Sequence, residues 1–304
     1  MVGWGAPWDM TSSTPQVVAV FGPTASGKTA VSEILAAELG TEVVSADALQ
    51  VYRGLPILTN QPDAPTRLVG IRRLSEEMSV GEYAGLAHAA VDELIEANGT
   101  AVVAGGTGLY LRAALVDLVI PAAAENGARA RWERVYDADP AAAHTQLSQL
   151  DPAAAATLHP NDRRRVVRAL ELSEVGASLI PARDRLWSAE MRRPTLVVGL
   201  DLPPTTLEHR IRERAAGMFA RGVTDEVQRA LREPISRTAA RALGLDDLAT
   251  LTPDEAFERI VVRTRRYAAY QRKWMRRIPG IVMIDADRPS EAVVDAILEV
   301  ARAR

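Results

Sequence analysis

The chain has 304 residues, of which 47% are hydrophobic and 25% are charged, and its formal net charge is −3. This composition excludes a wholly disordered or fibrous chain, and the length suggests two domains or one large domain with an insertion. Because cysteine is absent from the sequence, disulfides, thiolate nucleophiles and cysteine-bound metals are excluded. Any nucleic-acid binding must come from local basic patches, since the net charge is negative.

Targeting and membrane signals are not visible in the sequence. No apolar run approaches the roughly 18 residues of a membrane helix. Residues 1–15 have neither a basic start nor an apolar stretch, so we interpret them as a flexible tail rather than a secretory signal. We therefore expect a cytoplasmic protein that does not contact a membrane.

Short apolar runs alternate with helical stretches over much of the chain. Residues 16–21 predict a buried strand, which is followed by a glycine-rich loop and a helix that ends at Gly40. Further strands are expected at residues 41–46, 100–104, 195–200 and 281–284, and a helix at 80–97. This alternation predicts an α/β fold with a parallel sheet.

The pattern changes between about residues 121 and 194, where alanine-rich helical stretches replace the strands. Two of them begin at Asp139-Pro140 and Asp151-Pro152, since aspartate caps a helix and proline fits its first turn. We interpret residues 121–194 as a helical insertion into a core that is formed by residues 16–120 and 195–304.

Two long helices are predicted in the C-terminal part. The first extends from Pro204 to Arg221, and the second begins with a capping box at Thr252 and Glu255. Apolar positions of the second helix predict a buried stripe of Phe257, Ile260, Val261, Tyr267, Trp274 and Ile278. Basic residues fall on another face: Arg259, Arg263, Arg266, Lys273 and Arg277.

The first glycine-rich loop has the pattern G-x-x-x-x-G-K-[ST]. It consists of Gly22, Pro23, Thr24, Ala25, Ser26, Gly27, Lys28 and Thr29. Backbone amides of such a loop bind phosphate oxygens, the lysine contacts the outer phosphate, and the hydroxyl after it, here Thr29, binds Mg²⁺. Lys28 is one of only two lysines among 36 basic residues, and a compact ammonium suits this role better than a guanidinium. The loop predicts a phosphate ligand without specifying ATP.

Two further loops follow predicted strands. Asp47 comes after the second strand, and Gly105-Gly106-Thr107-Gly108 comes after the third. Since the carboxyl ends of parallel strands face one crevice, Asp47 is expected to point toward the phosphates. Its position alone leaves open whether it caps a helix, supports a metal or acts as a general base.

Five segments, in their order and spacing, resemble the tRNA dimethylallyltransferase (tRNA isopentenyltransferase) family. They are GPTASGKT, SADALQVYRG, GGTGLYLRA, HPNDRRRVVRALE and TRRYAAYQRKWMRR, within about residues 17–277. The resemblance implies a P-loop NTPase-like α/β core with an inserted helical domain that helps to grip tRNA. It also implies transfer of a dimethylallyl group from dimethylallyl diphosphate to N6 of the adenosine 3′-adjacent to the anticodon.

The resemblance assigns roles to matching residues. It implies that the segment from Thr24 to Thr29 binds the diphosphate and that Asp47 accepts the N6 proton. It implies tRNA contacts for Asp47, Ala48, Leu49, Gln50, Thr107, Arg129, Arg164, Arg165 and Arg168. Arg210 and Arg214 are weaker candidates for diphosphate contact. The chain departs from the family pattern at Ala48, Leu49, Gln61, Arg164, residues 69–72 and residues 245–247.

Such a transfer requires a positioned adenine amine, removal of its proton and neutralisation of the leaving diphosphate. Lys28, the loop amides and Mg²⁺ on Thr29 would supply the neutralising charge. A grip on the anticodon stem-loop would come from the arginines of residues 163–168 and from eight basic residues between Arg259 and Arg277. By pattern alone each patch could equally be a solvated helix face, with Arg168 paired to Glu171.

Other functions remain compatible with the same residues. The chain could be an ATP-dependent small-molecule P-loop kinase with Asp47 as its base, or it could prenylate a free adenine nucleotide. It could also be a non-catalytic homologue that binds tRNA or senses nucleotides. A monomer is expected, although the sequence does not fix the oligomeric state.

Overall fold

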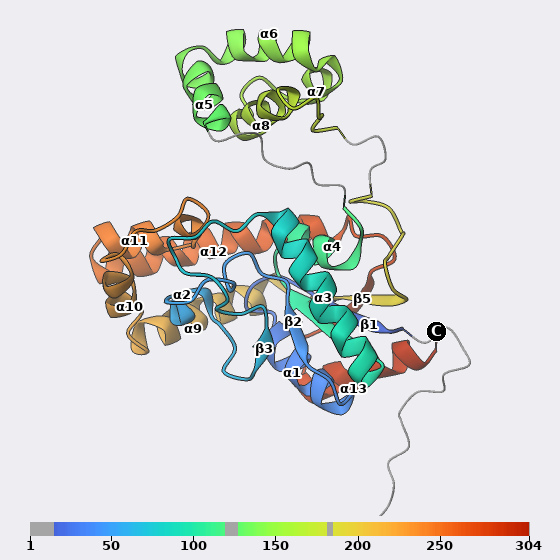
Figure 1. The fold of residues 1–304 in the computed structure, drawn as a ribbon. Helices are drawn as coiled ribbons and strands as arrows, with labels where there is room; N and C mark the ends of the chain where they lie inside the picture. The colour runs from blue at the N-terminus through green and yellow to red at the C-terminus, as the bar shows by residue number, and fades with distance from the viewer. Residues whose placement is uncertain (1–14, 119–126, 181–184, 304) are drawn as a thin grey trace, which may run out of the picture. The chain divides into compact units, whose positions relative to one another are not determined.

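The structure is a computed structural model that describes residues 15–118, 127–180 and 185–303. The chain divides into two compact units (Figure 1). The described residues up to Asp117 and from Ala189 onward form the body unit, and those from Leu118 to Ser188 form the insertion unit. The predicted tail of residues 1–15 lies outside the described residues, apart from Pro15.

The body unit contains a six-stranded parallel sheet in the order β3-β2-β4-β1-β5-β6. The strands are β1 (Val17–Phe21), β2 (Val43–Ser45), β3 (Thr66–Arg67), β4 (Ala101–Gly105), β5 (Thr195–Asp201) and β6 (Val282–Asp285). The central strands are almost wholly apolar because both of their faces are covered. The predicted α/β fold with a parallel sheet is therefore confirmed. The two-residue strand β3 was not predicted, because it is too short to show a period.

Strand register brings three loops together. Phe21, at the end of β1, pairs with Gly105 at the end of β4, and Ser45 of β2 pairs with Ala104. The loops after these strands therefore leave the sheet at the same edge. This is the edge at which open parallel sheets bind ligands.

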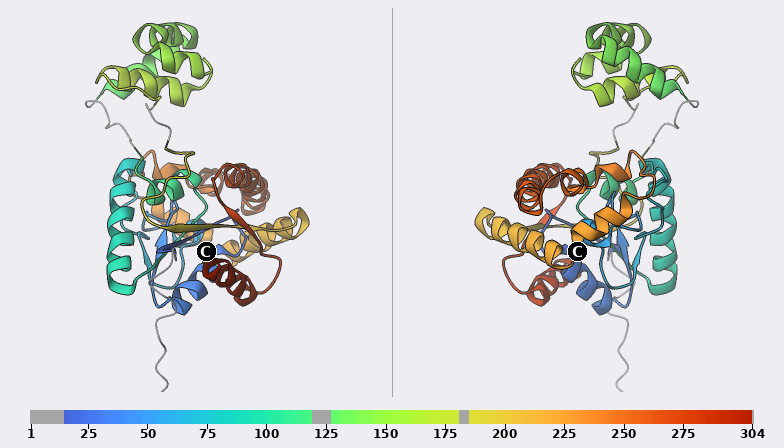
Figure 2. Two further views of the ribbon diagram at one scale, coloured as in Figure 1. Left: turned by 90° about the vertical axis from the view of Figure 1, so that its right-hand side faces the viewer. Right: turned by 90° about the vertical axis from the view of Figure 1, so that its left-hand side faces the viewer.

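Helices cover both faces of the sheet (Figures 1 and 2). α1 (Lys28–Glu38) and α13 (Ser290–Arg302) pack on one face, and α3 (Val80–Asn98) and α4 (Gly108–Leu115) pack on the other. α9 (Pro204–Ala220) packs along α12 (Pro253–Met275), which begins with the predicted capping box at Thr252 and Glu255. The shorter helices are α2 (Pro56–Thr59), α10 (Val223–Ala230) and α11 (Leu245–Thr250).

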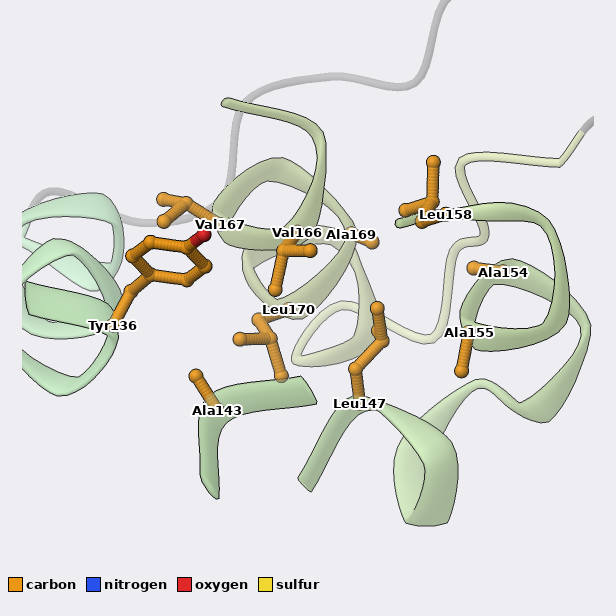
Figure 3. Close-up of a cluster of buried hydrophobic side chains, with 10 residues drawn as sticks. All are labelled: Tyr136, Ala143, Leu147, Ala154, Ala155, Leu158, Val166, Val167, Ala169 and Leu170. Atoms are coloured by element: carbon orange, nitrogen blue, oxygen red, sulfur yellow. The ribbon is translucent and has the colours of Figure 1, made fainter. Parts of the chain in front are cut away.

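The insertion unit has its own hydrophobic core (Figure 3). It consists of α5 (Ala128–Ala138), α6 (Pro140–Leu150), α7 (Pro152–Thr157) and α8 (Arg163–Ser173). Asp139 and Asp151 cap α6 and α7 by accepting hydrogen bonds from the first amides of each helix, as the sequence predicts. The core side chains are Tyr136, Ala143, Leu147, Ala154, Ala155, Leu158, Val166, Val167, Ala169 and Leu170.

The two chain segments that border the insertion are joined to each other and to α3 by contacts within the body unit. The backbone amide of Arg192 donates to the Leu115 carbonyl at 2.9 Å. The Arg192 guanidinium lies 2.8 Å from Asp92 and 3.2 Å from Asp117, and Arg193 lies 2.9 Å from Asp92. Residues 189–194, which the sequence analysis placed in the insertion, thus belong with the body, because these ion pairs fix them to α3.

Membrane-spanning helices are not found in the described part of the chain, where no helix combines the necessary length and apolar character.

Candidate active site

The predicted phosphate loop connects β1 to α1. α1 begins at Lys28, and Gly27 before it has φ +87°, a left-handed conformation that glycine adopts without strain. The Lys28 ammonium donates to the Pro23 carbonyl at 2.8 Å, so the side chain folds back over the loop. The first amides of α1 face the same region and, with the helix dipole, favour an anion there.

The charge environment of Lys28 is unusual. Burial and the positive charge of Arg214 lower the pKa of Lys28 to about 7, and the Asp47 carboxylate opposes this shift. Burial also lowers the pKa of Arg214. The positive charges of Lys28 and Arg214 repel each other in this buried site. An anion bound near both would relieve that repulsion and is therefore favoured.

Arg214 and Gln271 fix the conformation of the phosphate loop. Arg214, on α9, donates to the Thr24 hydroxyl at 2.7 Å. The buried Gln271 of α12 accepts from the Thr24 amide at 2.7 Å and donates to the Gly106 carbonyl at 2.8 Å. Gln271 therefore joins two of the three loops at the edge of the sheet. Its role was not predicted from the sequence, in which the only signal is a polar residue among the apolar positions of α12.

Asp47 lies in the loop after β2. Its Oδ1 accepts from the Leu49 amide at 2.9 Å, so the carboxylate stabilises its own turn while also lining the cleft described below. The loop packs directly against Gly105, where a Cβ would lie 2.1 Å from the Ala46 carbonyl oxygen. The Thr107 hydroxyl accepts from the Ala48 amide at 3.3 Å. Glycine at position 105 thus permits the approach that brings Asp47 toward the phosphate loop.

These groups line one cleft in the body unit, with an empty volume of about 1070 Å³ that includes its open mouth. Its polar wall contains Lys28, Thr29, Asp47, Gln50, Arg214 and Gln271. Its apolar wall contains Leu49, Leu58, Met218, Leu243 and Ile260. Tyr267 also lines the cleft. In the predicted stripe of α12, Ile260, Val261 and Ile278 are buried, whereas Phe257, Tyr267 and Trp274 are only partly buried. A ligand with an anionic end and a short apolar end fits this distribution of groups.

Residues 50–278 match the family model described as IPP transferase. The chain belongs to the IPP transferase family. It is 39% identical to the tRNA dimethylallyltransferase of Kineococcus radiotolerans, over 90% of this chain and 92% of that protein. It is 38% identical to the tRNA dimethylallyltransferase of Salinispora arenicola, over 92% of this chain and 85% of that protein.

Solved structures of tRNA-modifying transferases are similar in fold to this chain. The chain is similar to the full-length tRNA isopentenylpyrophosphate transferase of Bacillus halodurans, with a TM-score of 0.66, 30% identity and 95% of each chain covered. A eukaryotic dimethylallyltransferase acting on tRNA shares the fold, with a TM-score of 0.76 and 23% identity over 96% of this chain and 80% of that one. The recognised family resemblance is confirmed. Lys28 and Asp47 lie before residue 50, where the matched family segment begins.

Two glutamines of this IPP transferase family member form hydrogen bonds within the body unit. Gln50 was expected to contact RNA, and Gln61 is a departure from the family pattern. Gln50 accepts from the Ser45 hydroxyl at 2.7 Å and donates to the Asn60 carbonyl at 2.9 Å. Gln61 donates to the Tyr52 carbonyl at 2.7 Å. The side chains of Gln50 and Gln61 therefore shape the rim of the cleft from within the protein.

Further ion pairs and helix caps support the walls of the cleft. Buried Asp247 pairs with Arg263 at 2.8 Å, which gives one of the departures a structural role. The carboxylate of buried Glu226 accepts from the amides of Ile57 and Leu58 at 2.8 and 3.1 Å, and so caps α2. The capping role of Glu226 was not predicted from the sequence.

The candidate arginines of the insertion unit fall into two groups. Arg129 and Arg168 both approach the buried carboxylate of Glu171, at 3.5 and 2.9 Å. Arg164 and Arg165 are exposed, and Arg165 lies 3.7 Å from Asp162. The structure thus brings the loop residues, Asp47, Thr107 and Arg214 together in the body unit, and it groups Arg129 with Arg168 in the insertion unit. The weaker candidate Arg210 lies close to Gly27 and 3.8 Å from Asp287.

Proposed function

We propose that the protein transfers a dimethylallyl group from dimethylallyl diphosphate to N6 of the adenosine 3′-adjacent to a tRNA anticodon, and releases diphosphate. The observation that carries the proposal is the cleft, in which Lys28 and Asp47 lie beside an apolar wall. The proposal also draws on the relatives, since those of K. radiotolerans and S. arenicola are named tRNA dimethylallyltransferases.

The donor would bind with its diphosphate at the start of α1. The amides of Gly27, Lys28 and Thr29 precede or open the helix, and Lys28 and Arg214 add positive charge. Binding of the diphosphate would favour the charged form of Lys28. The dimethylallyl group would lie against the apolar wall, which includes Leu58, Met218 and Ile260.

The chemical step exchanges one bond for another. The C1–O bond to the diphosphate breaks, the N6–C1 bond forms, and N6 gives up a proton to the Asp47 carboxylate. Lys28 and the helix amides stabilise the negative charge that develops on the leaving diphosphate, and the cleft holds N6 close to C1. Hydrogen bonding between Asp47 and the Leu49 amide keeps the carboxylate in place during this step.

Magnesium fits the donor end of the cleft. Mg²⁺ in phosphate sites typically uses one or two protein groups together with substrate oxygens and waters. The Thr29 hydroxyl lines the cleft, and Glu33 lines it one helical turn later. No cluster of three or more histidine or acidic ligands occurs among residues 15–118, 127–180 and 185–303, so an all-protein cage is not expected there. Thr29 and the diphosphate oxygens would hold the ion, which would supply further neutralising charge to the leaving group.

We propose that the anticodon stem-loop contacts both units. In the body unit, Ala48, Leu49 and Thr107 border the position of Asp47. In the insertion unit, the exposed Arg164 and Arg165 would bind RNA phosphates directly. Arg129 and Arg168 would contribute less charge, because Glu171 neutralises them in part.

The test is product formation with purified protein, Mg²⁺, dimethylallyl diphosphate and an anticodon stem-loop, followed by mass spectrometry of the RNA. Asp47→Asn should lower kcat by about 10²- to 10⁴-fold, with little change in KM for the donor, because it removes the proton acceptor while keeping the shape. Binding of both substrates without product would refute the proposal and favour a non-catalytic homologue. ATP consumption with an acceptor hydroxyl would favour a kinase, and modification of AMP would favour a free nucleotide as acceptor.

A further inference from the structure

The surface of α12 passes from the wall of the cleft to a charged stripe. At about 100° per residue, Ile260, Thr264, Tyr267 and Gln271 share one side of the helix, and all four line the cleft. Tyr270 follows Tyr267 by three residues, so it lies about 60° around the helix from Tyr267 and about 90° from the middle of that side. Tyr270 is therefore the next side chain beside Tyr267 on the helix surface, roughly 4.5 Å further along the helix axis, and it does not itself line the cleft.

Tyr270 is unusual among the aromatic residues. Its side chain is 54% exposed, and it is the only exposed aromatic residue within residues 15–118, 127–180 and 185–303. Its ring meets that of Trp274 edge-on, with 6.5 Å between the ring centroids. Trp274 is fixed in turn by Gly108, where a Cβ would lie 2.3 Å from the indole ring. A firmly packed tryptophan thus supports an aromatic ring that faces solvent.

Basic residues flank Tyr270 on the side away from the cleft. Arg266, Lys273 and Arg277 lie four residues before, three after and seven after it, so the helical period places them on one stripe beside the ring. All three are exposed, and no ion pair joins Arg266 or Lys273 to another residue of the described chain. Three other arginines of α12 are paired with carboxylates: Arg263 with Asp247, Arg265 with Glu208 and Arg272 with Asp201. Positive charge is therefore concentrated where the aromatic ring is exposed.

We propose that Tyr270 is a stacking platform for the RNA base next to the adenosine that enters the cleft, with Arg266 and Lys273 binding the adjoining phosphates. This inference rests on the proposed function, since it assumes that the adenosine reaches Asp47. Aromatic rings stack on bases of any sequence, and nearby cations bind the backbone. A single ring surrounded by charge is too small an apolar patch for a protein interface, so an RNA partner fits better.

The experiment compares Tyr270→Ala, Tyr270→Phe and the matched control Met283→Ala, which removes an exposed apolar side chain (48%) from β6. The readouts are KM for the stem-loop, kcat, KM for dimethylallyl diphosphate, and binding of a fluorescent stem-loop. Loss of one stacked base should raise KM and Kd for the RNA by about 5- to 100-fold in Tyr270→Ala. Tyr270→Phe keeps the ring and should stay within about twofold of the wild type, as should Met283→Ala.

A second perturbation is made in the RNA. An abasic site at the nucleotide on one side of the target adenosine should weaken wild-type binding as much as Tyr270→Ala does, and the two changes should not add. An unchanged Kd for Tyr270→Ala, or additive effects at both neighbouring nucleotides, would overturn the stacking role. A wild-type protein that neither binds nor modifies the stem-loop would instead refute the proposed function, so the two failures are distinguishable.

Discussion

Gln271→Met tests the connection between the phosphate loop and the loop after β4. Methionine has a similar length but no amide, so the substitution removes the acceptor for the Thr24 amide and the donor for the Gly106 carbonyl. Each buried backbone group that loses its partner costs about 1–3 kcal/mol. The free energy of unfolding should therefore fall by about 2–6 kcal/mol if both loops keep their positions.

The unfolding free energy is measured by urea denaturation, and diphosphate binding by calorimetry with inorganic pyrophosphate and Mg²⁺. If the loops relax into the cleft, the free energy of unfolding should fall by less and the affinity for pyrophosphate should fall as well, because the Thr24 amide no longer fixes the loop. Ile260→Val is the control, since it shortens another α12 side chain that lines the same cleft and should cost only about 0.5–1.5 kcal/mol. A Gln271→Met protein within about 0.5 kcal/mol of the wild type, with unchanged pyrophosphate affinity, would refute the reasoning.

Two further predictions concern charge. In the protein without a ligand, the pKa of Lys28 is about 7, and a bound anion raises it. Donor binding at pH 8 should therefore be accompanied by uptake of nearly one more proton in the wild type than in Lys28→Met. This difference should disappear below about pH 6, where Lys28 is already charged. Calorimetry in buffers of different ionisation enthalpy measures it, and equal uptake by both proteins would contradict the assigned charge state. Arg165→Ala should weaken RNA binding and lower the salt slope by about one, whereas Arg163→Ala, which removes an arginine paired with Asp137, should change the slope less. Anisotropy titrations at several salt concentrations decide this, and an unchanged slope for Arg165→Ala would count against a phosphate contact.

Local patterns were sufficient for the main elements of the fold and for part of the candidate site. A strand, a glycine loop and a helix follow one another directly around Lys28, so the phosphate loop is visible in a short stretch of sequence. The position of Asp47 followed from the rule that parallel strands end at one edge. The pairing of Arg168 with Glu171 was likewise accessible, because the two residues are three apart on one helix.

Long-range contacts explain what the sequence did not reveal. Gln271 is separated from Thr24 by 247 positions and from Gly106 by 165, so no local pattern connects them. Glu226 caps α2 from 169 positions away, and that helix has too few residues for a detectable period. Periodicity also shows that Ile260 and Tyr267 share a face, and not whether that face meets the core or a cavity.

The ion pairs at Arg192 have a consequence for the evolution of such a protein. The chain segments at Asp117 and Arg192 are held together by these contacts, so the residues between them form one long loop whose two ends are fixed to the body unit. Closing a longer loop adds little entropic cost. A segment between these two points can therefore be lengthened, trimmed or exchanged among relatives while the sheet keeps its register, which lets the chemistry of the cleft and the properties of the inserted helices evolve separately.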